Sequence, residues 1–294
     1  MKSAIQKSIF HKSTIPSSRI FIARELCENH FDPAWHAHPE YQLFLVLEGT
    51  GTRFIGNTIK HFEKGDLTFL GPNVPHLWHN EDFYFDNHTE KCCRGVVIYF
   101  HNHSIGNLID KEEMQPLKNL FIKVNQGMEI EGNCARTISD LMLEIIDLRG
   151  TESFIQFIRI LDLLSKCKEY KLLHNDLYFS ELKETETDRI NIVFNFAAKN
   201  FKNKIKLEEV AELLNMTPTS FSRYFIKKTN KTFTYFLTEL RINNACKMLS
   251  SQENKNIAQI CYESGFNTLS NFNKQFKEFM KMTPYEYKSQ FFAL

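Results

Sequence analysis

A helix-turn-helix pattern occurs twice in the last third of the sequence, and this doubling constrains the fold more than any other feature. In each copy a short apolar helix leads through a turn into a second helix with two phenylalanines four residues apart. These are Phe221 and Phe225 in the first copy, and Phe272 and Phe276 in the second. Positions four apart share one face of a helix. We therefore expect this face to pack into a core, and the polar face opposite to be able to enter a DNA major groove.

Capping signals mark the start of the second helix in each copy. Thr217 precedes Pro218, which gives a hydroxyl cap followed by proline at the first helical position. In the second copy Gly265 suits a left-handed turn between the helices, and Asn267 or Thr268 can cap the next helix. One copy alone fits an ordinary capped surface helix equally well, whereas two aligned copies favour DNA binding. The residues expected to contact DNA are Thr219, Ser220, Ser222, Arg223 and Lys227 in the first copy, and Ser270, Asn271, Asn273 and Lys274 in the second.

Charge is divided unevenly along the chain. The whole sequence has 36 Lys and Arg against 35 Asp and Glu, a net charge of +1. Counted along the sequence, residues 188–294 hold 16 basic and 9 acidic side chains, which leaves 20 and 26 for residues 1–187. A basic block on a nearly neutral chain indicates a polyanionic partner for that block. A well-solvated surface is the alternative explanation of the charge taken alone.

The N-terminal part has the pattern of short β-strands. Between about residues 19 and 105, apolar runs such as Tyr41–Leu47 end in turn residues, and Gly56-Asn57 is typical of a hairpin. Such a pattern predicts an antiparallel sandwich or barrel. From about Glu112 the apolar period changes to that of amphipathic helices, and residues 174–187 are polar and acidic without a period.

These patterns predict an α+β protein with several domains. We expect an antiparallel β-barrel with helices at 1–111, a helical dimerisation region at 112–173, a linker at 174–187 and an all-α DNA-binding domain at 188–294.

Several classes of protein are disfavoured by the sequence. There is no run of eighteen apolar residues, so we expect no membrane span, and the polar N-terminus lacks the apolar region of a secretory signal. The seven cysteines are an odd number and form no C-x-x-C, which is typical of a reduced, cytoplasmic protein with structural thiols. No nucleophile triad, phosphate-binding loop or dinucleotide fingerprint is present, so we expect no catalytic residues.

Specific motifs link residues 188–294 to a known family. The motifs are Arg241–Ala245 with Met248-Leu249, Ile257–Cys261, Gly265-Phe266, Phe272, Phe276-Lys277 and Thr283–Tyr287. With these residues the segment resembles the AraC/XylS family of bacterial transcription regulators. The resemblance implies two helix-turn-helix units on one connecting helix, bound to adjacent major grooves of promoter DNA. It also implies a cytoplasmic homodimer and activation through RNA polymerase. Ile226 and Cys261 depart from the residues frequent in the family, Lys and Ala, and packing variation accounts for both.

A second resemblance covers residues 20–105. His36-Ala37-His38 with Gln42 and Gly49 looks like the first cupin motif, with Gln42 in place of the usual Glu. The stretch from Gly65-Asp66 to His76 and Asn80 matches the second motif in spacing. Two histidines at i and i+2 of a strand point to the same side, so His36, His38 and His76 are candidate ligands for a divalent metal. Because an amide is a poorer ligand than a carboxylate, we expect no metal and no other cofactor. Histidines that hydrogen-bond a polar ligand, or that are satisfied within the core, are the alternatives.

The barrel is the expected site of a small polar effector, such as a sugar. Aromatic faces and hydrogen-bond donors suit such a ligand. The expected effector-binding residues are Trp35, His36, His38, Tyr41, Arg53, His76 and Trp78. The sequence therefore predicts a DNA-binding transcription regulator that responds to this effector and is not an enzyme. A metal-dependent cupin enzyme fused to a DNA-binding domain is the alternative, and a scaffold that binds DNA without a ligand is a third interpretation.

Overall fold

The structure is a computed structural model that describes residues 15–16, 18–56, 58–86, 92–173, 184–229, 231–250 and 255–292. The chain forms two compact units, one from most of the residues up to Thr187 and the other from Asp188 onwards. Of the predicted linker at 174–187, residues 174–183 lie outside the described residues. Its last four residues form the first turn of α4 (Glu184–Asn200).

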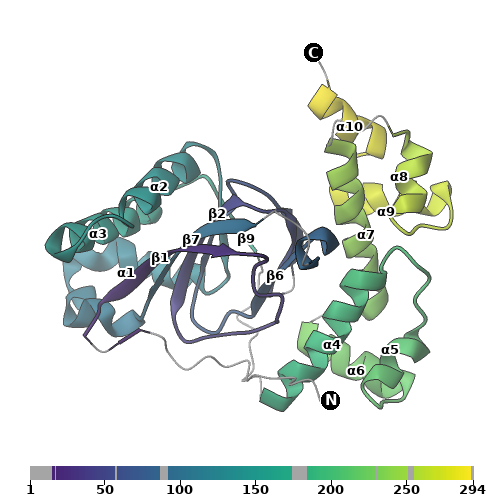
Figure 1. The fold of residues 1–294 in the computed structure, drawn as a ribbon, viewed down its shortest axis with the longest axis horizontal. Coiled ribbons are helices and arrows are strands. Elements are labelled where there is room, and N and C mark those ends of the chain that lie inside the picture. Colours follow the sequence, from purple (N-terminus) through teal and green to yellow (C-terminus); the bar gives the residue numbers. More distant parts are fainter. Residues whose placement is uncertain are drawn as a thin grey trace. The chain divides into compact units, whose positions relative to one another are not determined.

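The N-terminal unit contains two antiparallel sheets (Figure 1). The six-stranded sheet has the order β1 (Phe21–Glu28), β7 (Cys93–Phe100), β2 (Tyr41–Glu48), β5 (Leu67–Leu70), β8 (Met128–Ile130) and β9 (Tyr170–Leu172). The three-stranded sheet has the order β4 (Thr58–Phe62), β3 (Gly51–Ile55) and β6 (His76–Asn80). Three 3-10 helices, η1 (Asp82–Phe85), η2 (Asn102–Asp110) and η3 (Glu112–Met114), connect these elements.

Alternation along the central strands gives the six-stranded sheet two different faces. In β2, Leu43 and Leu45 belong to the core under the helices α1 (Gln115–Val124), α2 (Gly132–Glu144) and α3 (Gly150–Lys166). Their neighbours Phe44 and Val46 belong to a second apolar cluster, which also contains Trp78 of β6. Successive side chains of a strand point to opposite faces, so one face packs against helices and the other faces the smaller sheet.

The predicted helical region at 112–173 is not purely helical. It contains the helices α1, α2 and α3, but β8 and β9 lie within it and extend the six-stranded sheet through β5. Strands of three residues are too short to show a two-residue period in the sequence. The two strands make this region part of the same core as the sheet.

The C-terminal unit is entirely helical in its described residues. After α4 follow α5 (Leu207–Leu213), α6 (Pro218–Thr229), α7 (Phe233–Ser250), α8 (Ile257–Glu263), α9 (Leu269–Met280) and α10 (Pro284–Phe292). Phe221, Phe225, Phe272 and Phe276 are each 0% exposed. We call α6 and α9, the second helix of each helix-turn-helix copy, the reader helices. The predicted inward face of both reader helices is therefore confirmed.

The long helix α7 supplies residues to the cores of both helix-turn-helix units. Phe233 packs edge-on against Phe221, with ring centroids 5.6 Å apart. Ile242 and Leu249 belong to the second cluster, which is centred on Phe272 and Phe276. One continuous helix therefore joins the two units through their apolar interiors.

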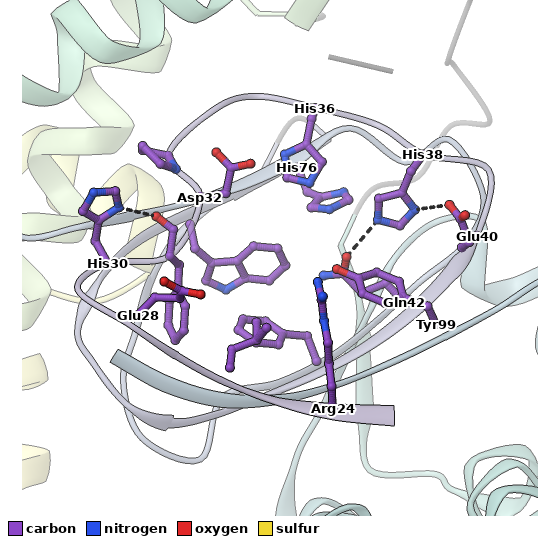
Figure 2. Close-up of a pocket in the computed structure, with 15 residues that line it drawn as sticks. Arg24, Glu28, His30, Asp32, His36, His38, Glu40, Gln42, His76 and Tyr99 are labelled. Carbon is purple, nitrogen blue, oxygen red and sulfur yellow. Dashed lines mark hydrogen bonds and ion pairs between the residues drawn. The ribbon is translucent and has the colours of Figure 1, made fainter. Parts of the chain in front are cut away.

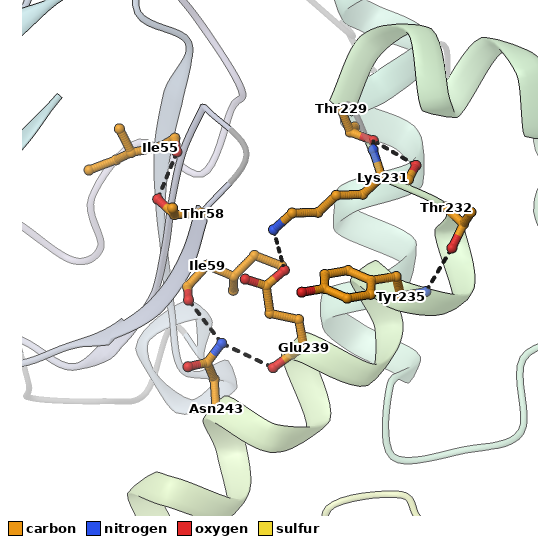
Figure 3. Close-up of polar contacts among 9 residues, drawn as sticks. All are labelled: Ile55, Thr58, Ile59, Thr229, Lys231, Thr232, Tyr235, Glu239 and Asn243. Carbon is orange, nitrogen blue, oxygen red and sulfur yellow. Dashed lines mark hydrogen bonds and ion pairs between the residues drawn. The ribbon is translucent and has the colours of Figure 1, made fainter. Parts of the chain in front are cut away.

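Polar side chains fix the corner between α6 and α7 (Figure 3). The Thr229 hydroxyl donates to the Phe225 carbonyl at 2.8 Å and accepts from the Lys231 amide at 3.3 Å. Thr232 caps α7 by accepting from the Tyr235 amide at 3.2 Å, and Lys231 Nζ lies 2.6 Å from Glu239 Oε2. These short-range contacts fix how α7 follows α6 of the first helix-turn-helix unit.

Each short first helix ends in a left-handed residue before its reader helix begins. Asn215 has φ of 53° after α5, and Gly265 has φ of +86° after α8. A Cβ on Gly265 would lie 2.5 Å from the Phe201 carbonyl oxygen and 2.9 Å from Lys202 Cα. Glycine is therefore required at this turn both by the backbone conformation and by the close approach of another segment.

The sequence predicts mostly thiols, and the structure adds one disulfide. A disulfide joins Cys134 to Cys167, whereas Cys27, Cys92, Cys93, Cys246 and Cys261 are free. The two bonded residues are 33 positions apart, so no local spacing pattern reveals them. The antiparallel path of α2 and α3 brings them together.

Among the described helices, none is both long and apolar enough to span a membrane.

Replacing Phe272 by Ala is expected to lower the free energy of unfolding of the C-terminal unit by about 3–5 kcal/mol, because it empties a fully buried site. Urea denaturation followed by circular dichroism measures the change. Asn273→Ala, at the exposed next position of α9, is the matched control and should change stability by less than about 0.5 kcal/mol. Equal stability of the two variants would contradict the packing described here.

Candidate functional site

A cavity of 560 Å³ lies in the N-terminal unit on the face of the large sheet that is turned away from α1–α3 (Figure 2). Its walls combine apolar and polar side chains. They are Arg24, Leu26, Glu28, His30, Phe31, Asp32, Pro33, His36, His38, Glu40, Gln42, Phe44, His76, Trp78 and Tyr99. The volume suits a small molecule, and pockets with a mainly apolar wall and a few convergent polar groups are typical ligand sites.

Three histidines meet at this cavity. His36 and His38 come from the segment before β2, and His76 begins β6. The backbones of His36 and His76 exchange two hydrogen bonds, of 3.0 and 2.8 Å, so the two residues are held side by side. One ring nitrogen from each of the three histidines lies within 4.8 Å of the others.

Backbone carbonyls select the tautomer of two of these rings. His36 Nδ1 lies 2.7 Å from the Ala34 carbonyl oxygen, and His76 Nδ1 lies 2.7 Å from that of Val74. A carbonyl oxygen only accepts, so each Nδ1 carries the proton and donates. The lone pair of each neutral ring is consequently on Nε2, which is the atom that can accept from a hydroxyl or bind a cation.

His38 is engaged on both sides of its ring. Its Nε2 lies 2.9 Å from Gln42 Oε1, and its Nδ1 lies 3.3 Å from Glu40 Oε2 (Figure 2). The other oxygen of Glu40 is 3.8 Å from His101 Nε2. A metal bound by three imidazoles fits His36 and His76 directly, but His38 has to give up one of its two partners to join them. The donor set therefore fits a divalent cation only in part.

The cavity also offers donors beside an aromatic wall. Trp78 is 4% exposed, and its indole Nε1 has no hydrogen-bond partner among the residues that the structure describes. Burial raises the pKa of Tyr99 to about 12, so its phenol keeps its proton at neutral pH. The Arg24 guanidinium lies over the Tyr99 ring, 5.9 Å from its centroid. Arg24 and Tyr99 therefore place a cation and a phenol next to flat apolar surfaces in the cavity wall.

Four of the seven residues expected to bind an effector line the cavity, namely His36, His38, His76 and Trp78. Trp35 does not line it, because adjacent residues of an extended segment point to opposite sides and His36 takes the inner side. Tyr41 lies on the helix-facing side of β2 and stacks on Phe100 at 4.9 Å.

Arg53 is also outside the cavity, in a buried ion-pair cluster. Its side chain is 1% exposed, with Nε 2.9 Å from Asp66 Oδ2 and one terminal nitrogen 2.8 Å from Glu129 Oε2. Burial alone lowers the pKa of Arg53, but the two carboxylates outweigh it and hold this pKa above its ordinary value. The cluster ties β3 of the small sheet to β8 of the large one, so the role of Arg53 is to join the sheets.

β1 contributes cavity residues that the sequence motifs do not mark. Arg24, Leu26 and Glu28 alternate along this strand and all line the cavity, followed by His30 and Asp32 just after it. The two-residue period of the strand contains this signal. Neither cupin motif includes these residues, and for that reason they were not singled out.

The two reader helices present polar surfaces. Thr219, Ser220, Arg223 and Lys227 of α6 and Ser270, Asn271, Asn273 and Lys274 of α9 are exposed. Ser222 differs, because it is half-buried and its hydroxyl donates to the Pro218 carbonyl at 2.9 Å. Such a bond along the helix makes Ser222 the weakest of the predicted DNA contacts.

Both predicted caps of the reader helices are present. Thr217 Oγ1 accepts from the Ser220 amide at 3.2 Å, and Thr268 Oγ1 accepts from the Asn271 amide at 3.3 Å. Thr268, and not Asn267, therefore caps α9. The capped N-terminal turns carry the exposed polar residues, which is where a recognition helix contacts base edges.

Comparison with known proteins agrees with the division of the chain into an N-terminal and a C-terminal unit. Residues 210–290 match a family described as a helix-turn-helix domain, and residues 26–82 match one described as a cupin domain. The chain is 25% identical over 264 residues to the HTH-type transcriptional activator RhaS of Mannheimia succiniciproducens, covering 85% of this chain and 87% of the relative. It is 24% identical over 260 residues to an uncharacterized HTH-type transcriptional regulator, YdeC of Bacillus subtilis, covering 86% and 85%.

Among solved structures, ToxT of Vibrio cholerae matches over 94% of this chain and 99% of its own length, at 14% identity and a TM-score of 0.37. The domain matches and the curated relatives, together with the capped reader helices, indicate the same class of protein. The chain is a transcription regulator with a cupin domain followed by an AraC-type DNA-binding domain of two helix-turn-helix units.

Proposed function

We propose that this regulator is a cytoplasmic homodimer whose binding to promoter DNA responds to a small polar molecule held in the 560 Å³ cavity. The observation that carries the proposal is the wall of that cavity. Imidazoles held in one tautomer, the Trp78 indole and the Arg24 guanidinium lie in this wall together with apolar aromatic surface. A sugar or related polyol has hydroxyls that both donate and accept, and a C–H face that packs on aromatic rings.

Regulation follows if the effector prefers one arrangement of the protein over another. A ligand shifts an equilibrium only by the difference between its affinities for the two states. Residues of the cavity wall and of the chain segment leaving the cupin domain share one apolar cluster, which includes Trp78 and Leu173. Occupancy of the cavity is therefore in a position to alter the packing of that segment.

We further propose that the regulator activates transcription through contact with RNA polymerase, and that the helical region around α1–α3 mediates dimerisation. The name of the RhaS relative, an activator, supports the first part. The exposed apolar side chains Ile122, Leu143 and Ile155, one on each of these helices, support the second. Dimerisation would bring four reader helices to one operator.

A divalent cation is the second candidate for the cavity, because three histidines offer ligand atoms within 4.8 Å. A bound metal would supply a Lewis acid, and turnover of a substrate would then make the domain an enzyme. Metal analysis of the purified chain decides the point. Stoichiometric metal that His76→Ala loses would favour this candidate over the effector pocket.

Arg223→Ala is expected to weaken binding to the operator by about 1–3 kcal/mol and to relax selection at one base position, because arginine can fork onto guanine. Fluorescence anisotropy with a randomised set of operator variants measures both effects. Lys166→Ala removes a cation from α3 in the N-terminal unit and is the matched control. Unchanged base preference in Arg223→Ala would contradict the assignment of α6 as a reader.

Trp78→Phe is expected to weaken effector binding about tenfold, because it removes one hydrogen-bond donor and keeps the aromatic wall. A thermal-shift screen of sugars and sugar acids first identifies the ligand, which raises the melting temperature by binding the folded state. Calorimetry then gives the affinities. Tyr41→Phe removes a hydroxyl from the helix-facing core and should leave the affinity unchanged. If both variants bind as tightly as the wild type, the ligand does not occupy this cavity.

A further inference from the structure

The cysteine pair lies where two helix ends meet. Cys134 is the third residue of α2, and Cys167 follows the last residue of α3. Their Cα atoms are 6.1 Å apart, within the range of about 4.4–6.8 Å that disulfides span in proteins. The bond therefore fastens the end of α3 to the start of α2.

β9 begins three residues after Cys167, close to the disulfide. Glu169 contacts the start of α2 twice, since its Oε2 accepts from the Cys134 amide at 2.9 Å and its carbonyl accepts from the Glu131 amide at 2.8 Å. Gly132 makes room for this side chain, because a Cβ there would collide with the Glu169 carboxylate. The disulfide thus lies beside the polar contacts through which the segment after α3 is attached.

β9 itself is short and lies at the edge of the sheet. It pairs only with β8 among the described strands, through three residue pairs from Ile130↔Tyr170 to Met128↔Leu172. Leu173 then donates its amide to the Gly127 carbonyl at 3.0 Å and packs in the cluster that contains Trp78. A three-residue edge strand has little stability of its own, so a covalent bond at its base matters for its attachment.

A second cavity borders Cys167. It has a volume of 290 Å³ and is lined by Cys167 together with the polar side chains of Asn119, Lys123, Ser165 and Tyr170. Lys123 is exposed and lies 5.8 Å from the centroid of the Tyr170 ring. A cavity lined by both Cys167 and the cation of Lys123 suits a small anionic thiol or the disulfide of such a thiol.

We propose that Cys134 and Cys167 form a reversible thiol–disulfide site for low-molecular-weight thiols and disulfides, and that its oxidation state sets how firmly β9 is attached. In a reducing compartment, a disulfide that persists only part of the time is typical of redox sensing. The state of this site is then a second input to the regulator, besides the effector. The regulatory step rests on the proposed function, whereas the thiol chemistry and the attachment of β9 do not.

The exchange proceeds in two balanced steps. Starting from the dithiol, Cys167 loses its proton and attacks the small disulfide, which forms a mixed disulfide and releases one small thiol. Cys134 then loses its proton and attacks the Cys167 sulfur, which closes the protein disulfide and releases the second small thiol. The two protein thiols are oxidised and one small disulfide is reduced to two thiols. Excess small thiol reverses both steps.

The first experiment equilibrates the full chain with mixtures of reduced and oxidised glutathione, alkylates the remaining thiols and maps them by mass spectrometry. We expect Cys134 and Cys167 to become protected together as oxidised glutathione increases, and to be released by excess reduced glutathione. In Cys134→Ser we expect glutathione to remain attached to Cys167, since the second step is removed. Cys27→Ser, which changes an exposed thiol elsewhere, should behave as the wild type.

Two outcomes would overturn the chemistry: both cysteines still open to alkylation in excess oxidised glutathione, or no adduct at Cys167 in Cys134→Ser. Hydrogen exchange tests the attachment of β9 on the same samples. We expect the amides of Tyr170–Leu173 to exchange about tenfold more slowly in the oxidised wild type, and at the reduced rate in Cys134→Ser in both buffers. Equal rates in the two oxidation states would overturn this part.

Titration of the oxidised and reduced samples with operator DNA tests the regulatory step. A difference in affinity that is absent from Cys134→Ser supports it, and equal affinities in the two states would exclude it. Absence of binding in both states would instead count against the proposed DNA-binding function, and would leave the alkylation and exchange results standing.

Discussion

The two-residue period of β2 and β7 is the constraint on which the N-terminal unit depends. Odd positions such as Leu43 and Leu45 form the core under the helices, while Phe44, at an even position, lines the cavity. A shift of either strand by one residue would exchange these two sets, placing cavity residues in the core and apolar core residues in the cavity. The stability of the unit and the lining of its ligand site therefore depend on the same strand pairing. A change of register would alter both.

Arg53 shows why the position of a polar residue in a motif-rich region does not reveal its role. The sequence places this arginine close to the histidines, which suggests a ligand contact, but its partners Asp66 and Glu129 come from other parts of the chain. A buried guanidinium needs such partners, and only the tertiary structure shows that β8 supplies the second one. Tyr41 lies outside the cavity for a related reason, since its side of the strand depends on a register that neighbouring residues do not define.

The C-terminal unit was predictable to a much greater extent because its signals are local. The four-residue spacing of the phenylalanines, the Thr217 and Thr268 caps and the left-handed turn at Gly265 can each be recognised within a few residues of the sequence. By contrast, the pairing of β8 with β9 and of Cys134 with Cys167 joins segments far apart in the sequence. Only short-range physics can be read directly from spacing, and for this reason the cavity wall contributed by β1 and the disulfide were not foreseen.

The path of α7 through both aromatic interiors has a consequence for how binding sites for this protein can diverge. Because a helix rises by a fixed amount per residue, α7 holds the two helix-turn-helix units that pack on it at a constant spacing and rotation about its axis. New operators can arise by substitution of the bases that either helix-turn-helix unit contacts. An insertion or deletion between the two contacted DNA segments would move one segment away from its helix-turn-helix unit. The number of base pairs between the two segments should therefore vary far less among operators than the base sequence of the segments themselves.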